Sequence, residues 1–111
     1  ELQVLDSEDA RYAKLDARQY HGSSYGMAAA HRGYLRAPNT WNYQEVTVKG
    51  STIKVELNGN IILDTDLSKI TDYMAKSPHP GKDLKEGHFG FAGHSDPVRF
   101  RNLHIKPIVS K

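Results

Sequence analysis

Apolar and polar residues alternate along most of this chain, which is the pattern of β-strands that bury one face. The alternation predicts strands over residues 1–6, 41–48, 53–57, 61–63, 87–92 and 98–107. Short strands in this number, separated by turn residues, are typical of a β-sandwich or jelly roll. The sequence therefore predicts an all-β fold.

The central strands are expected to form a three-strand meander. In the first of them, Val46 and Val48 share one face. A turn at residues 49–50 leads to the second strand, and the Asn58-Gly59 pair leads to the third. This dipeptide favours a two-residue hairpin because both of its residues tolerate a positive φ.

The first six residues predict a strand whose two faces differ. Leu2 and Val4 occupy the face that would enter a core, whereas Glu1 and Gln3 face solvent or a cleft. Because this strand pattern is already present at residue 1, at least one sheet edge would lack its neighbour. We therefore expect an N-terminal portion or a second chain to complete the sheets.

Two segments carry helical signals. Asp6–Arg18 contains good helix formers after Ser7, which is a suitable N-cap, and Leu67–Ala75 has room for a short turn or two. The second of these lies within Asp64–Lys85, a polar segment with the length of a functional loop.

Composition narrows the class of protein. Hydrophobic residues make up 38% and charged residues 25% of the 111 residues, as in one ordinary globular domain. The net charge of +2 comes from basic residues mixed with acids, which argues against a nucleic-acid partner. No apolar run is long enough for membrane insertion. Because the chain has no cysteine, disulfides and thiolate metal sites are excluded.

The last third of the chain concentrates polar groups on a strand-like pattern. A Gly-rich bend carries His94 and Asp96, which lie two residues apart and so share one face of an extended segment. Histidine is suited to general-base chemistry because its reference pKa of about 6.5 lies near neutrality. This cluster is therefore the first place to expect a site.

Three sequence blocks resemble the 3-keto-disaccharide hydrolase domain family. They are YHGSSYGM (Tyr20–Met27), WNYQEVTVKGSTIKVELNGNIILDTDL (Trp41–Leu67) and GHFGFAGHSDPVRFRNLHIK (Gly87–Lys106). The resemblance implies a concanavalin-like jelly-roll sandwich that is incomplete here, with residues 1–111 as the C-terminal portion of a single domain. It also implies a bacterial periplasmic or secreted setting.

The resemblance further implies cleavage of 3-keto-glycosides. A ketone at C3 acidifies the hydrogen on C2, so a base can remove it, the C1 substituent is eliminated, and addition of water completes a net hydrolysis. His94, or His21 in the YHGSSYG turn, is expected to be the base. Asp96 would orient an imidazole or help to bind a divalent cation, either calcium or a transition metal, which is the one cofactor that these residues suggest.

Further residues are expected to bind the carbohydrate substrate. The set comprises Glu1, Gln3, Tyr25, Trp41, Arg99 and Arg101. Its aromatic members offer flat surfaces to a sugar ring, and its polar members can bond to sugar oxygens. Each has a structural alternative: Trp41 would also suit a core position, and His94 would also suit a turn cap.

Three other functions are compatible with the same fold. A conventional glycosidase needs two carboxyl groups across the scissile bond, and the available acids are Glu1, Asp6, Glu45 and Asp96. A non-catalytic carbohydrate-binding module would use the aromatic surfaces without a base. A domain that only mediates contacts within an assembly would need neither.

Overall fold

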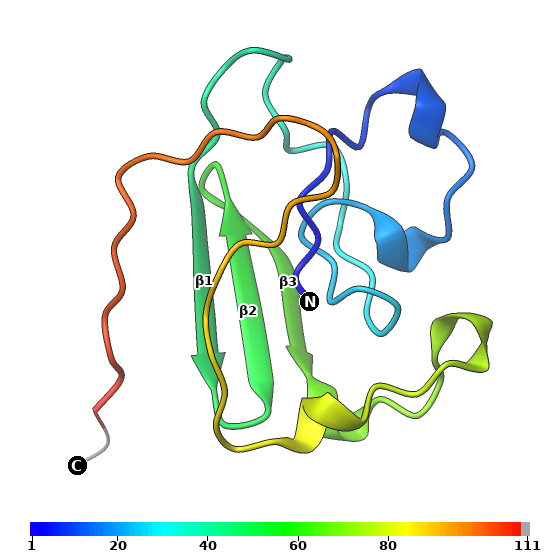
Figure 1. The fold of residues 1–111 in the computed structure, drawn as a ribbon, viewed down its shortest axis with the longest axis vertical. Helices are drawn as coiled ribbons and strands as arrows, with labels where there is room; N and C mark the ends of the chain where they lie inside the picture. Colours follow the sequence, from blue (N-terminus) through cyan, green and yellow to red (C-terminus); the bar gives the residue numbers. More distant parts are fainter. Residues whose placement is uncertain (110–111) are drawn as a thin grey trace.

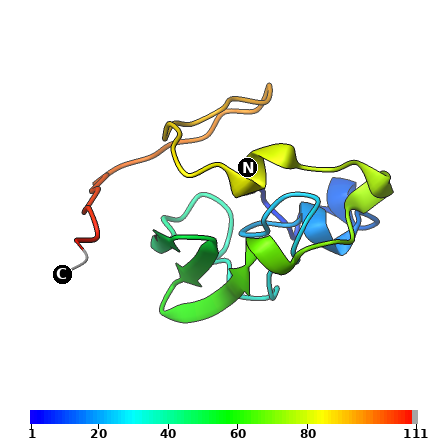
Figure 2. The same ribbon diagram turned by 90° about the horizontal axis from the view of Figure 1, so that it is seen from below.

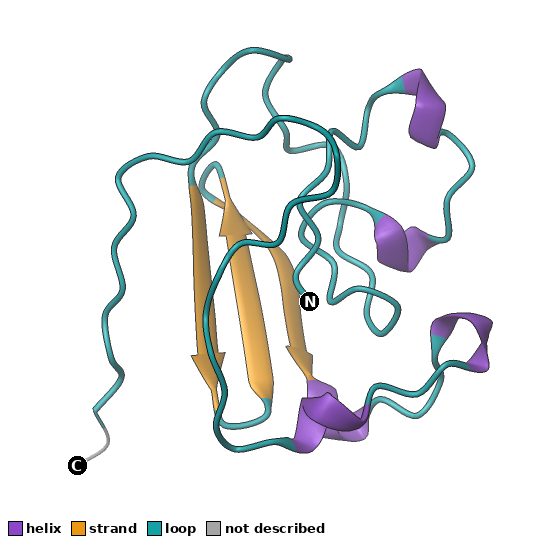
Figure 3. Cartoon of the chain, in the orientation of Figure 1, coloured by secondary structure: helices purple, strands orange, loops and turns teal. Residues whose placement is uncertain are grey.

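The computed structural model describes residues 1–109, which contain one antiparallel sheet (Figure 1). Its strands follow chain order as β1 (Gln44–Lys49), β2 (Thr52–Leu57) and β3 (Asn60–Asp66). The helical elements are short 3-10 turns, drawn purple in Figure 3: η1 (Ala10–Tyr12), η2 (Ala17–Gln19), η3 (Leu67–Lys69), η4 (Met74–Lys76) and η5 (Pro80–Asp83). The all-β prediction is confirmed.

The predicted three-strand meander and the turn of its second hairpin are confirmed. Leu57 pairs with Asn60, so Asn58 and Gly59 form a two-residue turn. Their φ angles are 50° and 86°, both positive as this turn requires. The first turn differs by one residue from the prediction because the pairing of Lys49 with Thr52 places it at residues 50–51.

The Asn58 side chain also fixes where β1 begins. Its carbonyl oxygen accepts the N–H of Tyr43 at 2.9 Å, and its amide donates to the carbonyl of Tyr34 at 2.7 Å and to Asn42 at 2.9 Å. The alternation predicted that this strand starts at residue 41. It starts at Gln44 instead, because a side chain rather than a strand satisfies the N–H of Tyr43.

The core lies on one face of the sheet, over β2 and β3. Val55, Leu57, Ile62 and Leu63 are buried there together with Ala30 from the segment that crosses them. Val55 pairs with Leu63 and Glu56 pairs with Ile61, so the register shifts there and Ile62 is an extra residue in β3. This bulge accounts for the burial of two consecutive residues, Ile62 and Leu63.

The apolar face of β1 continues this core face but is not covered by it. Val46 lies opposite Val55 and Val48 lies opposite Ile53, so these side chains share one face of the sheet. Val46 and Val48 are nevertheless 41% and 61% exposed. The prediction of which face they share is correct, whereas their burial is incomplete because the core cluster is built over β2 and β3.

The predicted strand at residues 1–6 shortens to one β-bridge between Leu2 and Ser24. Leu2 packs against the core as expected, but Val4 is 43% exposed. The ladder ends because the next backbone donor, the N–H of Leu5, bonds to the ring of His21 instead of to a strand.

The helix predicted over Asp6–Arg18 was wrong. Asp9 and Asp16 each accept the backbone N–H two residues further on, which favours isolated turns over a continuous helix. Ser7 caps no helix; its buried hydroxyl accepts the N–H of His21. The short turns expected in the following polar loop do form, as η3 and η4.

The strands predicted over 87–92 and 98–107 do not form within residues 1–109. The chain after η5 is extended and lies above the sheet as a separate layer in Figure 2. Its two halves meet through side chains: the rings of Phe91 and Phe100 stack with centroids 4.0 Å apart. A strand requires a backbone partner, and the described chain supplies none to these residues. No helix in residues 1–109 has the length and apolarity needed to cross a membrane.

Candidate functional site

His21 lies where three segments meet. Its Nδ1 accepts the backbone N–H of Leu5 at 3.2 Å, and its Nε2 lies 2.7 Å from the Oε1 of Gln44 on β1. Because a backbone N–H only donates, Nδ1 must be unprotonated, and Nε2 carries the proton given to Gln44. The imidazole is therefore neutral and both of its nitrogens are engaged.

Burial lowers the pKa of His21 from its ordinary value of 6.5, against the opposing effect of its hydrogen bond to Gln44. To accept a substrate proton, this ring would have to release the N–H of Leu5. In the arrangement described, His21 holds the N-terminal segment against β1.

We expect acidification to destabilise the fold through His21. The unfolded chain takes up this proton near pH 6.5, and the folded chain does so only at lower pH. Between these two pKa values the unfolded state binds more protons, so the free energy of unfolding falls as the pH falls through that window. Urea unfolding at a series of pH values measures this fall in the free energy of unfolding.

The pH dependence of the free energy of unfolding is compared between the native chain and His21→Asn. His104→Asn serves as the control, because His104 is exposed. The native chain and the control should lose more stability across the window than His21→Asn does. Equal losses in all three proteins would contradict this assignment.

The predicted site residues fall into separate groups. In the first, the N–H of Tyr25 donates to the carbonyl of Glu1 at 2.9 Å. The amide of Gln3 donates to the carbonyl of Gln19 at 3.0 Å, and the amide of Gln19 donates to the hydroxyl of Tyr25 at 3.0 Å. The structure thus places Glu1, Gln3 and Tyr25 near one another, and the polar groups of Gln3 and Tyr25 are bonded within the protein.

A second group joins the meander to the C-terminal segment. The guanidinium of Arg101 lies 4.1 Å from the centroid of the Trp41 ring. Trp41 is 40% exposed and so does not occupy the core. One face of the indole is occupied by the cation, with which it forms a cation–π contact. Arg99 is exposed two residues earlier in the same segment.

His94 and Asp96 form the third group, in an exposed bend. The N–H of Asp96 donates to the carbonyl of His94 at 2.9 Å, and Ser95 between them has a φ of 70°. The side chain of His94 is exposed. Of the two histidines predicted as bases, His94 is therefore the accessible one.

Neither of two depressions found in the described structure is lined by both histidines. His21 borders a small depression of about 10 Å³, together with His31 and Arg32. A larger open groove of about 620 Å³ lies elsewhere. His94 borders neither of the two.

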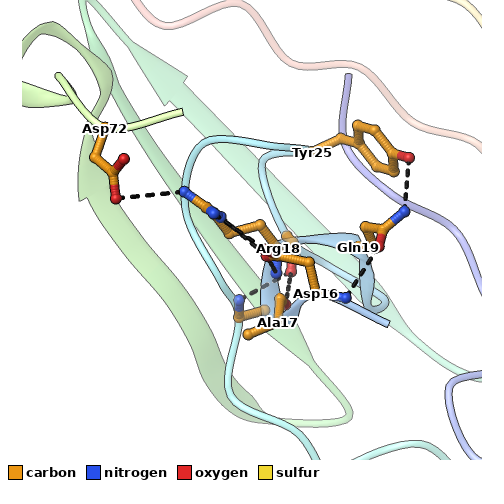
Figure 4. A network of polar contacts seen from close by, with 8 residues as sticks. Asp16, Ala17, Arg18, Gln19, Tyr25 and Asp72 are labelled. Atoms are coloured by element: carbon orange, nitrogen blue, oxygen red, sulfur yellow. Dashed lines mark hydrogen bonds and ion pairs between the residues drawn. The ribbon is translucent and has the colours of Figure 1, made fainter. Parts of the chain in front are cut away.

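Sequence reasoning missed the charged residues of the larger groove. Arg18 binds Asp16 through Nε at 2.9 Å and Nη2 at 3.0 Å, and its Nη1 lies 3.6 Å from Asp72 (Figure 4). The hydrogen bonds from Arg18 lower the pKa of Asp16 to about 2. The signal was present in the sequence as a repeated Asp-Ala-Arg, because Asp9 and Arg11 form the same pair.

The carboxylates and imidazoles do not assemble a cation site by themselves. Among the described residues, no three His, Asp or Glu side chains gather closely enough to hold a metal ion. In particular, the contacts described for Asp96 include no such group. The divalent cation that the sequence suggested stays a prediction.

Comparison with known proteins identifies relatives of the chain. The sequence model of the 3-keto-alpha-glucoside-1,2-lyase-like domain matches residues 1–106. No curated protein sequence matches significantly. A crystal structure of a putative glycosyl hydrolase from Parabacteroides distasonis aligns with a TM-score of 0.65 and 24% identity over 75% of this chain. The alignment covers 47% of that protein, so the chain spans about half its length, and at this identity the similarity shows the fold.

Proposed function

The chain belongs to the 3-keto-alpha-glucoside-1,2-lyase-like domain family, and on that premise we propose that its protein cleaves glycosides whose sugar carries a ketone at C3. The observation that carries the proposal is the extent of the match. It spans residues 1–106 and so includes the bend that holds His94 and Asp96. The carbohydrate-active class follows from the family, and the reaction from the chemistry of the ketone.

The proposed reaction begins with removal of the hydrogen on C2. The base takes this proton, and the electron pair of the C–H bond moves into an enolate whose charge rests on the C3 oxygen. When the carbonyl re-forms, a C1–C2 double bond forms and the bond from C1 to the leaving oxygen breaks. The leaving group takes up a proton, and water then adds across the double bond, which gives a net hydrolysis.

We assign the base to His94 and a positioning role to His21. The ring of His94 is exposed, whereas His21 would have to give up a backbone hydrogen bond before it could accept a proton. Asp96 lies two residues beyond His94 in the same bend and can orient an imidazole that becomes charged. This division of roles is supported by hydrogen bonding at His21 rather than by proximity of the two rings.

The remaining parts of the site are proposed to lie outside residues 1–111. This chain covers 47% of the aligned glycosyl hydrolase, which supports the proposal that the complete domain is larger. We propose that a further segment or a second chain completes the cleft over the C-terminal bend. A periplasmic or secreted setting is proposed on the basis of the family alone.

A substrate deuterated at C2 tests this reaction directly. Full-length protein acting on a 3-keto-glucoside should show a primary isotope effect and a transient ultraviolet absorbance from the conjugated enone, because C2–H cleavage precedes loss of the C1 substituent. Turnover without an isotope effect or an enone would favour a conventional two-carboxylate glycosidase. Binding without turnover would indicate a non-catalytic carbohydrate-binding module.

A further inference from the structure

The groove missed by sequence reasoning is lined by residues 16–18 at η2, by Met27 and Ala29, and by residues 69–72 at the end of η3 and just after it. It is shallow and open to solvent, with a volume of about 620 Å³.

The groove offers both hydrogen-bond donors and hydrogen-bond acceptors. Asp16 binds Arg18 through two guanidinium nitrogens and fixes its orientation, while Nη1 of Arg18 is directed toward Asp72 (Figure 4). The separation of 3.6 Å between Nη1 and Asp72 Oδ2 is too long for a hydrogen bond. The side chain of Asp72 is 94% exposed, so its carboxylate is available to a ligand.

A hydroxyl group fits beside this ion pair. It can accept a hydrogen bond from Nη1 of Arg18 and donate one to the carboxylate of Asp72 at the same time. A charged ligand group cannot do both, because an ammonium only donates and a carboxylate only accepts. Lys69 and Thr71 border the same groove and supply further donors. The apolar side chains of Met27, Ala29 and Ile70 line it as well and can contact the C–H face of a sugar ring.

We propose that this groove is a binding site for a neutral saccharide. An acidic sugar would meet the carboxylates of Asp16 and Asp72, which balance the charges of Arg18 and Lys69. A neutral sugar uses donors and acceptors together. The site lies apart from the His94 bend, so this inference goes beyond the proposed reaction and stands even if His94 has no catalytic role.

The proposal is tested by NMR titration of the full-length, methyl-labelled protein with maltotriose and cellotriose, with trigalacturonate as the acidic comparison. At least one neutral trisaccharide should shift the methyl resonances of Ala29 and Ile70. Asp72→Asn should raise its Kd about tenfold, the effect of weakening a hydrogen bond to a charged group. Glu86→Gln, an exposed acid outside the groove, should leave the Kd unchanged.

Each other outcome would overturn the proposal. Absence of binding by both neutral trisaccharides would do so, as would shifts confined to other parts of the protein. Binding of trigalacturonate alone at Ala29 and Ile70 would make this an acidic-sugar site. Equal Kd values for Asp72→Asn and Glu86→Gln would show that Asp72 does not contact the ligand. None of these results depends on turnover, so failure here is distinct from failure of the isotope test.

Discussion

Replacing His94 with alanine is expected to lower kcat for a 3-keto-glucoside at least about a hundredfold, because a positioned general base contributes a factor of about 10² to 10⁴. The side chain is exposed and so contributes little packing to the fold. The substitution should therefore leave the unfolding midpoint unchanged. Steady-state kinetics and thermal unfolding of the full-length protein measure the two effects.

His104→Ala is the matched control for this prediction. His104 is another exposed histidine of the same extended segment, ten residues beyond the bend. Its removal should leave kcat unchanged, and added imidazole should restore part of the activity of His94→Ala alone. Unchanged kcat in His94→Ala, or equal losses in both variants, would contradict the assignment of His94 as the base.

Local signals in the sequence were sufficient for the meander. Alternation located β2 and β3, although β3 continues to Asp66 and so takes in the start of the segment predicted as a loop. The conformational tolerance of Asn58 and Gly59 specified the turn between them. These signals act between residues close in the chain, so no knowledge of the remaining fold is needed. The strands predicted over 87–92 and 98–107 failed for the opposite reason: alternation shows that a segment suits a sheet but does not provide its hydrogen-bonding partner.

The candidate site could be predicted only as a set of residue types. The sequence indicated that Gln3 and Tyr25 could bind sugar, but both are bonded to Gln19, which lacked any distinguishing signal. Likewise, the cation over the Trp41 ring comes from Arg101, sixty residues further along. Which partner a polar side chain finds depends on how distant loops pack, and that information is not present in residue spacing.

The same network connects the proposed saccharide groove to the N-terminal segment. The backbone N–H of Asp16 donates to the side chain of Gln19 at 3.0 Å, and Gln19 in turn donates to Tyr25. Asp16 also fixes Arg18 in the groove wall (Figure 4). These bonds link Gln3 and Tyr25, which were predicted to touch substrate, to residues that line the groove.

Gly22→Ala is expected to cause the largest loss of stability, about 2–4 kcal/mol, because it combines backbone strain with overpacking. Gly22 has a φ of 82°, and an added Cβ would lie 2.3 Å from the Cδ1 of Ile62 and 3.5 Å from the Cβ of Ala30. Ile62 is fully buried in the core, so its side chain has little room to move away. The free energy of urea unfolding measures this loss.

Gly33→Ala separates the two causes. Gly33 also has a positive φ, 100°, but an added Cβ there meets nothing within 4 Å. It should therefore show the backbone strain alone, about 1–2 kcal/mol. The difference between the two variants isolates the contact with Ile62, on which the packing of the His21 turn against β3 depends. If both substitutions cost the same, the turn is not held against the sheet by this close approach, and the position of His21 beside Gln44 must be maintained by their hydrogen bond instead.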